Sequence, residues 1–195
     1  MTVQERKERE RAQRRQAIID SARELAESDG WEAVTVRRLA DRIEYSQPVL
    51  YSHFSGKRAI VSAVAEEGIA LLRDVLRAAH EQSDGSPGGA MEAVARAYLQ
   101  FAIDNPALYD AMCVQDTELP FGPDAPQTLR DCFEELERLF RPLVPEDESG
   151  AYTEVFWSAL HGMAELDRNS RLRPDLWEQR MHVLMHWANR RVEQR

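Results

Sequence analysis

The chain has 195 residues, of which 43% are hydrophobic, so it can bury the core of one large domain or of two small ones. No stretch approaches the roughly 20 apolar residues of a membrane span, and the N-terminal segment TVQERKERERAQRR is unlike the apolar core of a signal peptide. These features predict a globular, cytoplasmic protein without a membrane partner. Cys113 and Cys132 have no metal-ligand spacing, so we expect two buried, reduced thiols and neither a disulfide scaffold nor a metal site.

Charge is distributed unevenly along the chain. The net charge of −9 argues at first sight against a nucleic-acid partner. However, residues 1–58 carry a balance of +2, whereas residues 59–195 carry −11. This asymmetry is compatible with a small DNA-binding head on an acidic body, because only the docked face must neutralise phosphates.

Helical periodicity runs through almost the whole sequence. Apolar residues recur three and four positions apart and no segment alternates strictly, so the predicted fold class is all-α. We expect a charged flexible tail over residues 1–10, a three-helix helix-turn-helix domain that binds DNA over 11–56, and a helical ligand-binding and dimerisation domain over 57–195. The expected helices span about residues 11–28, 36–43, 47–54, 55–82, 90–104, 107–114, 127–140, 150–169 and 173–192.

The second and third of these helices form a helix-turn-helix pattern. Thr35 and Ser46 can cap them, and Pro48 lies in the first turn of the third helix, where a missing amide hydrogen costs little. The expected apolar anchors of this helix are Val49, Leu50 and Phe54, and the side chains expected to face outward are Gln47, Tyr51, Ser52 and His53. Two short helices in this geometry place the second in the major groove of DNA.

The outward-facing side chains suit particular parts of a duplex. Gln47 can hydrogen-bond an adenine edge or contact another base, and Arg37 can reach a phosphate or a guanine edge. The side chains suited to phosphate oxygens are Thr35, Tyr51, His53 and Lys57. The alternatives are a plain three-helix bundle in which Tyr51 and His53 are ordinary surface residues, or a Thr35 or His53 that only caps or packs.

Residues 30–64, GWEAVTVRRLADRIEYSQPVLYSHFSGKRAIVSAV, carry a specific motif. Its Gly-aromatic pair, its Thr before the second helix and its L-Y-x-H-F-x-x-K run closely resemble the DNA-binding domain of the TetR family. The resemblance implies a transcriptional repressor that leaves a palindromic operator in double-stranded DNA when a small-molecule inducer binds. It implies base contacts by Arg37 and Gln47, packing of Pro48 and Val49 near bases or thymine methyl groups, and backbone contacts by Thr35, Tyr51, His53 and Lys57.

Glu44 departs from the family pattern. The turn usually carries Gly at this point, because the backbone there is left-handed. A residue with a Cβ costs roughly 1 kcal/mol in that conformation, and a carboxylate near phosphates would repel them. We therefore expect a tolerated but slightly strained turn.

The last two helices are apolar on more than one face. Residues 152–172 place one apolar row on the face of Phe156 and a second row on the side of Trp157, and the final helix is apolar around much of its circumference. This pattern predicts a homodimer through the last two helices, with two recognition helices about 34 Å apart. The expected interface residues are Trp157, Leu160, Leu176, Leu184 and Trp187.

A second motif lies in this region. Trp157 and His161-Gly162 form a W-x-x-x-H-G run which, with residues 101–114, resembles the C-terminal domain of the TetR subgroup named for its WHG motif. Gly162 within a helix costs about 1 kcal/mol relative to Ala. We therefore expect either a close helix approach or room for a ligand at Gly162.

An inducer pocket is expected among the helices of the C-terminal domain. The candidate lining residues are Phe101, Tyr109, Met112, Phe133, Phe156, His161 and Met163. Their aromatic and thioether character favours an apolar or aromatic small molecule, and no other cofactor is expected. The alternative for each residue is simple core packing, and for His161 a hydrogen-bonded position in the interior or at an interface.

The alternative classes of function are an enzyme and an interaction module. For an enzyme, carboxylate pairs such as Glu134 with Glu135 or Glu165 with Asp167 are available, but they are expected on solvated helix surfaces, and there is no nucleophile motif or phosphate loop. The prediction is therefore that the chain is not an enzyme. The third possibility is a dimeric interaction module whose head does not bind DNA, because of Glu44 and the acidic body.

Overall fold

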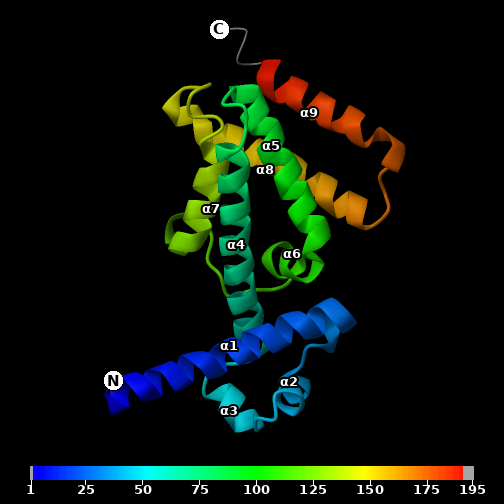
Figure 1. The fold of residues 1–195 in the computed structure, drawn as a ribbon. Helices are drawn as coiled ribbons and strands as arrows, with labels where there is room; N and C mark the ends of the chain where they lie inside the picture. The colour runs from blue at the N-terminus through cyan, green and yellow to red at the C-terminus, as the bar shows by residue number, and fades with distance from the viewer. Residues whose placement is uncertain (1, 191–195) are drawn as a thin grey trace. The chain divides into compact units, whose positions relative to one another are not determined.

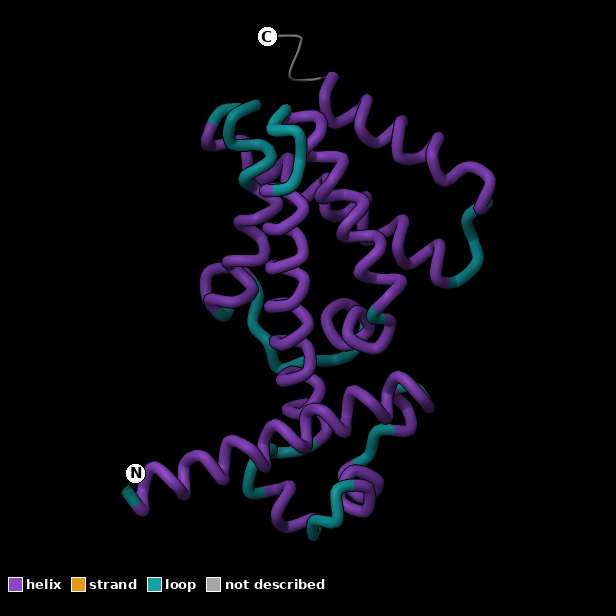
Figure 2. The backbone as a smooth tube through the Cα atoms, in the orientation of Figure 1, coloured by secondary structure: helices purple, strands orange, loops and turns teal. Residues whose placement is uncertain are grey.

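The computed structural model describes residues 2–190, and within that range it consists of helices and connecting turns without a β-strand (Figures 1 and 2). The predicted all-α class is thus confirmed. The elements are α1 (Val3–Asp29), η1 (Trp31–Ala33), α2 (Val36–Arg42), α3 (Gln47–Tyr51), α4 (Lys57–Glu81), α5 (Pro87–Asp104), α6 (Pro106–Cys113), η2 (Gly122–Asp124), α7 (Gln127–Glu137), α8 (Glu146–Arg168), η3 (Pro174–Leu176) and α9 (Trp177–Arg190). None of these helices is both long enough and apolar enough to span a membrane.

Helix α1 begins earlier than expected. Thr2 caps it: the Thr2 hydroxyl accepts a hydrogen bond from the amide of Glu5, and the Glu5 carboxylate accepts one from the amide of Thr2. This reciprocal capping box satisfies two amides that the first turn leaves unpaired. Residues 3–10, which were expected to form a tail, are therefore helical.

The ends of other helices also differ from the expectations. Helices α5 and α8 begin earlier, at Pro87 and directly after Pro145, because a proline is favourable at or just before the first turn of a helix. Helices α3 and α7 end earlier, at Tyr51 and Glu137, and continue as turns. Residue 192, the expected end of the last helix, lies outside the described residues.

The described chain forms two compact units. Among the described residues, the first contains residues 2–68 and 105–125, and the second contains residues 69–104 and 126–190. Helix α4 is continuous through the boundary between residues 68 and 69. The predicted division into three domains stays a prediction.

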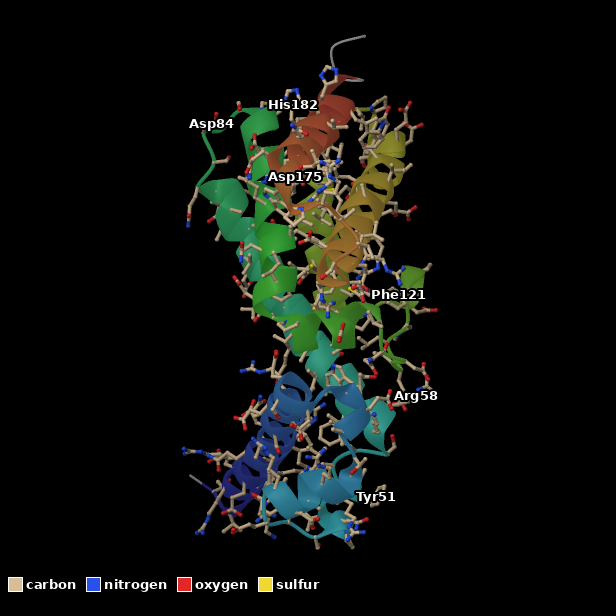
Figure 3. All side chains as sticks on the ribbon, turned by 90° about the vertical axis from the view of Figure 1, so that its right-hand side faces the viewer. Tyr51, Arg58, Asp84, Phe121, Asp175 and His182 are labelled. Carbon is tan, nitrogen blue, oxygen red and sulfur yellow. The ribbon has the colours of Figure 1, made fainter. Side chains whose placement is uncertain are left out.

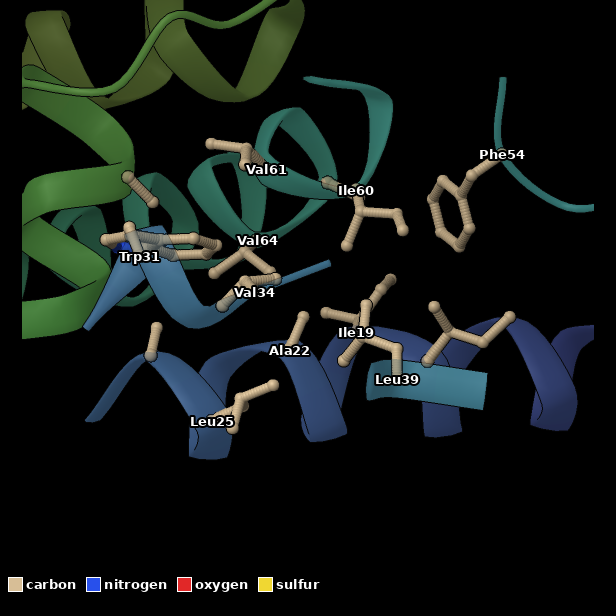
Figure 4. Packing of buried hydrophobic residues seen from close by; sticks show 14 of the residues in the cluster. Ile19, Ala22, Leu25, Trp31, Val34, Leu39, Phe54, Ile60, Val61 and Val64 are labelled. Atoms are coloured by element: carbon tan, nitrogen blue, oxygen red, sulfur yellow. The ribbon is translucent and has the colours of Figure 1, made fainter. Parts of the chain in front are cut away.

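The first unit has its own hydrophobic core (Figure 4). Helix α1 packs against η1, α2 and α6, and buried residues of α3 and of the start of α4 belong to the same cluster. Helix α6 belongs to the same unit, because the buried indole of Trp31 donates a hydrogen bond of 3.0 Å to the carbonyl of Ala107. The residues labelled in the close view are Ile19, Ala22, Leu25, Trp31, Val34, Leu39, Phe54, Ile60, Val61 and Val64.

The second unit is built around α5 and α8. Helix α8 packs against α5 and α7, and α9 packs against α5. Phe140 meets Phe156 edge to face, with ring centroids 5.5 Å apart. Cys132 is buried here as predicted, whereas Cys113, in the first unit, is only half-buried.

Glu135 corrects the prediction that the carboxylate pairs are solvated. Its side chain is 5% exposed, and its two oxygens accept hydrogen bonds from Arg77 and Arg138, each at 2.8 Å. Glu134 is exposed as expected, and Glu165 and Asp167 are half-buried. Glu135 is buried because α4 and the end of α7 supply the arginines that compensate its charge.

Candidate nucleic-acid interface

Local sequence signals position α3. The hydroxyl of Thr35 accepts a hydrogen bond from the amide of Arg38 at 3.2 Å, which caps α2 as predicted. Ser46 occupies the capping position of α3, but its side chain makes no capping hydrogen bond. Pro48 lies in the first turn, and buried Leu50 fixes the opposite face of the helix in the core.

Glu44 makes the turn between α2 and α3 and has the predicted left-handed backbone, with φ of +57°. The turn is closed by a hydrogen bond of 3.0 Å from the amide of Tyr45 to the carbonyl of Ala40. The Glu44 side chain is exposed, so its charge stands at the surface beside α3. The turn therefore stores backbone strain at a position where glycine would have none.

The face of α3 that points away from the core is polar. Gln47, Pro48 and Tyr51 are exposed, Tyr51 to 55%, and Val49 is half-buried. Tyr51 projects from the surface of the first unit (Figure 3). Arg37 on α2 is exposed as well. The structure thus leaves all of these predicted DNA-contacting side chains accessible, and their contacts stay predictions.

Lys57 and His53 are less free than the sequence indicated. The ammonium group of half-buried Lys57 donates a hydrogen bond of 2.6 Å to the carbonyl of Trp31, so it ties η1 to the start of α4. His53 is also half-buried. Burial lowers the pKa of His53, and the positive charges of nearby arginines lower it further. Neutral His53 can still donate one N–H to a phosphate.

Sequence reasoning missed the arginines of α1 beside α3. The guanidinium of Arg15 lies over the ring of Phe54, with 4.8 Å between its central carbon and the ring centroid. Arg11 and Arg14 act with Arg15 on the pKa of His53. The signal was present, because these residues lie in the predicted helix over residues 11–28 and continue the helical spacing of its buried stripe, but the interface was sought only in the second and third helices.

The predicted ligand-pocket residues fall in both units. Phe101, Tyr109 and Phe156 are fully buried, and Met112, Phe133, His161 and Met163 are half-buried. Met112 packs on α4, where a Cβ added at Gly68 would lie 2.7 Å from its sulfur. A hollow of about 660 Å³ in the second unit is lined by other residues, namely Glu137, Arg141, Glu146 and Ser149.

The predicted dimer residues differ in exposure. Trp157 and Trp187 are exposed to 36% and 42%, and Leu176 is half-buried. Leu160 and Leu184 are buried in the core of their own chain, so they add little surface for a partner. Exposed apolar side chains that the prediction omitted are Val155, Leu166 and Val183.

Gly162 leaves open space where a side chain would begin. A Cβ added there would meet no atom within 4 Å, so a close approach of another helix of the same chain does not explain this glycine. Trp157, one turn earlier, donates its indole hydrogen to the hydroxyl of Tyr98 at 3.1 Å.

Two family models match the chain. The model described as bacterial regulatory proteins of the tetR family matches residues 18–64, which contain α2, α3 and part of α1. The model described as the tetracyclin repressor-like C-terminal domain matches residues 91–188, about half of the chain.

Curated relatives agree with these models. The chain is 34% identical over 94 residues to the uncharacterized HTH-type transcriptional regulator YobS of Bacillus subtilis, which is 48% of each chain. It is 50% identical over 52 residues to the class C tetracycline repressor protein of Escherichia coli, which is 27% of this chain and 24% of the repressor. The matched segments thus span about half or less of these relatives.

Solved structures share the fold over most of the chain. A protein of unknown function from Rhodococcus sp. RHA1 has a TM-score of 0.70 at 21% identity, over 92% of this chain and 93% of its own. A TetR variant from Acinetobacter baumannii AYE, in complex with minocycline, has a TM-score of 0.61 at 17% identity, over 90% and 92%. These likenesses show the shared fold, and the two family models show that the chain belongs to the TetR family of bacterial regulatory proteins.

Proposed function

We propose that this chain represses transcription by binding a palindromic operator in double-stranded DNA through α3. The observation that carries the proposal is the exposed polar face of α3, with Gln47 and Tyr51 accessible on a helix that Leu50 anchors in the core. A glutamine at the start of such a helix suits a base edge, and the tyrosine hydroxyl suits a phosphate. The further residues proposed to lie near bases are Arg37, Pro48 and Val49. Those proposed to contact the DNA backbone are Thr35, His53 and Lys57. No catalytic activity is proposed.

The test is binding to the DNA upstream of the protein's own gene, measured by a mobility shift at increasing salt. We expect the wild-type protein to bind with an affinity that falls as salt rises, and Gln47→Ala combined with Tyr51→Ala to abolish specific binding. Gln179→Ala removes an exposed glutamine from the second unit and should leave binding unchanged. No binding at low salt would favour an interaction module without DNA-binding activity.

The active form is proposed to be a homodimer that pairs through α8 and α9. The exposed apolar residues of these helices support the proposal, since large apolar side chains cost free energy in contact with water. Leu160 and Leu184, which the sequence placed at the interface, are left out of this proposal because they are buried in their own chain. The proposed interface comprises Val155, Trp157, Leu166, Val183 and Trp187, with Leu176 at its edge.

A small-molecule inducer is proposed to bind in the second unit and to change the tilt of α4. Phe101, Phe133, Phe156 and Met163 are the candidate residues there, and they favour an apolar or aromatic ligand. The minocycline complex of a protein with the same fold supports a small-molecule ligand. The mechanism requires that the ligand and DNA prefer different conformations. Equal operator affinity with and without a bound ligand would rule it out.

The chain is also proposed to belong to the WHG subgroup. Trp157 lies one turn before the adjacent pair His161 and Gly162 on α8, which supports this assignment.

A further inference from the structure

The N-terminal half of α1 carries basic side chains on the face that is apolar further along the helix. Ile18 and Ala22 are buried in the core of the first unit. Counting back from Ile18 in steps of four, three and four residues gives Arg14, Arg11 and Lys7, which share its face. All three side chains are exposed. We call Lys7, Arg11 and Arg14 the basic stripe.

Two residues of the basic stripe, Arg11 and Arg14, lie near the residues that follow α3. Arg15, next to Arg14, lies over Phe54, which follows α3. Arg11 and Arg14 are close enough to His53 for their charges to act on it. Figure 1 shows the first turns of α1 extending past α3. The stripe therefore lies beside the end of the proposed recognition helix.

In the described part of the chain, the three side chains of the stripe form no ion pair. On another side of α1, Arg6 forms an ion pair of 2.9 Å with Glu10. Among residues 2–190, no carboxylate pairs with Lys7, Arg11 or Arg14. Like charges three and four residues apart destabilise a helix slightly. A bound polyanion would attract all three side chains and offset the repulsion between them.

We infer that the basic stripe binds phosphates of the DNA backbone next to those contacted by the end of α3, an inference that rests on the proposed function. Lys7 and Arg14 are seven residues apart, about 10 Å along a helix. That span corresponds to about three nucleotides of one strand, at about 3.4 Å each. Phosphate contacts carry no sequence information, so the stripe adds affinity without changing the preferred sequence.

The test compares two charge-matched variants of the full chain on one duplex. The duplex is the one that the wild-type protein enriches most from a random pool, flanked on both sides by about ten base pairs. The stripe variant is Lys7→Gln, Arg11→Gln and Arg14→Gln. The control variant, Arg6→Gln, Arg9→Gln and Arg23→Gln, removes three exposed charges from the other side of the helix. The readout is the slope of log affinity against log salt concentration.

We expect the stripe variant to lose about five units of slope per bound dimer, since three phosphate contacts are lost in each of the two copies and each lost contact removes about 0.9. The control variant should retain the wild-type slope, and Arg11→Lys with Arg14→Lys should retain it too, which guards against a folding defect. An unchanged slope in the stripe variant, or an equal loss in both variants, would overturn the inference. If the wild-type protein enriches no duplex at all, the proposed function itself fails.

Discussion

Glu44 is the residue at which the sequence departs most clearly from what the local backbone prefers. It holds φ of +57° in the turn before α3, where a glycine has no steric penalty. The exposed carboxylate also stands near the proposed DNA-binding face. Strain and charge are separate effects, and different substitutions remove them.

Glu44→Gly should raise the free energy of unfolding by up to about 1 kcal/mol, because it relieves the left-handed strain, and it should also raise DNA affinity. Glu44→Gln keeps the Cβ and loses the charge, so it should raise affinity alone. Urea denaturation and a DNA mobility shift measure the two effects. If Glu44→Gly alters neither stability nor affinity, the turn is not strained in the way described.

His53 makes the stability of the first unit depend on pH. Burial and the charges of Arg11, Arg14 and Arg15 lower its pKa below the ordinary 6.5, so the folded chain takes up the proton less readily than the unfolded chain. The stability associated with neutral His53 is therefore present above pH 6.5 and is lost as the pH falls below 6.5 towards the folded pKa.

His53→Gln should therefore lose less stability than the wild-type protein between about pH 7.5 and 5.5. The double variant Arg11→Gln with Arg14→Gln should lose less stability than the wild-type protein over the same pH range, but more than His53→Gln. The reason is that these two charges are only one cause of the lowered pKa of His53. Urea denaturation at a series of pH values measures both. Parallel stability profiles for wild-type and His53→Gln proteins would contradict this account.

At the scale of elements, the buried carboxylate of Glu135 joins α7 to α4. Glu135→Ala leaves Arg77 and Arg138 without their partner, and both arginines can partly regain water because they are about half exposed. We expect a loss of about 2–3 kcal/mol in the free energy of unfolding. Glu134→Ala, at an exposed neighbouring position, should change it by less than about 0.5 kcal/mol. Similar small losses in both variants would show that the pair contributes little.

The elements themselves were predictable where the signals are local. Thr35, Pro48 and the periodicity around Leu50 set α2 and α3, and these signals lie within a few residues of the elements they define. The contact of Trp31 with Ala107 spans 76 residues, and that of Arg77 with Glu135 spans 58, so no local pattern reveals them. The same limit explains why Lys57 was expected to be free and Glu135 to be solvated.

At the proposed interfaces, the sequence predicted which side chains face outward better than it predicted which part of the chain, or which partner, covers them. Gln47 and Tyr51 are accessible as expected, because they are four residues apart and share one side of a short helix whose buried side holds Leu50. Leu160 and Leu184 were assigned to a dimer interface because an apolar stripe does not reveal whether its own chain or a partner covers it. Only the structure separates these two kinds of burial.

At the scale of the whole molecule, Gly162 tests the proposed dimer. A Cβ at this position meets open space in the chain itself, so Gly162→Ala should stabilise α8 by about 1 kcal/mol in the monomer. If a partner helix approaches closely there, the same change should weaken dimerisation by about tenfold. Gly150→Ala, also without a neighbour within 4 Å, is the matched control and should leave dimerisation unchanged. Sedimentation analysis that gives both variants the wild-type dimer affinity would remove Gly162 from the interface.

The central claim is that two copies of the chain read duplex DNA through α3. Hydroxyl-radical footprinting of the wild-type protein on its own upstream region tests this claim most directly. We predict two symmetric protected half-sites whose centres lie about 34 Å apart, one turn of the duplex, with both lost in Gln47→Ala combined with Tyr51→Ala. Protection that survives this double substitution, or no protection at all, would contradict the account.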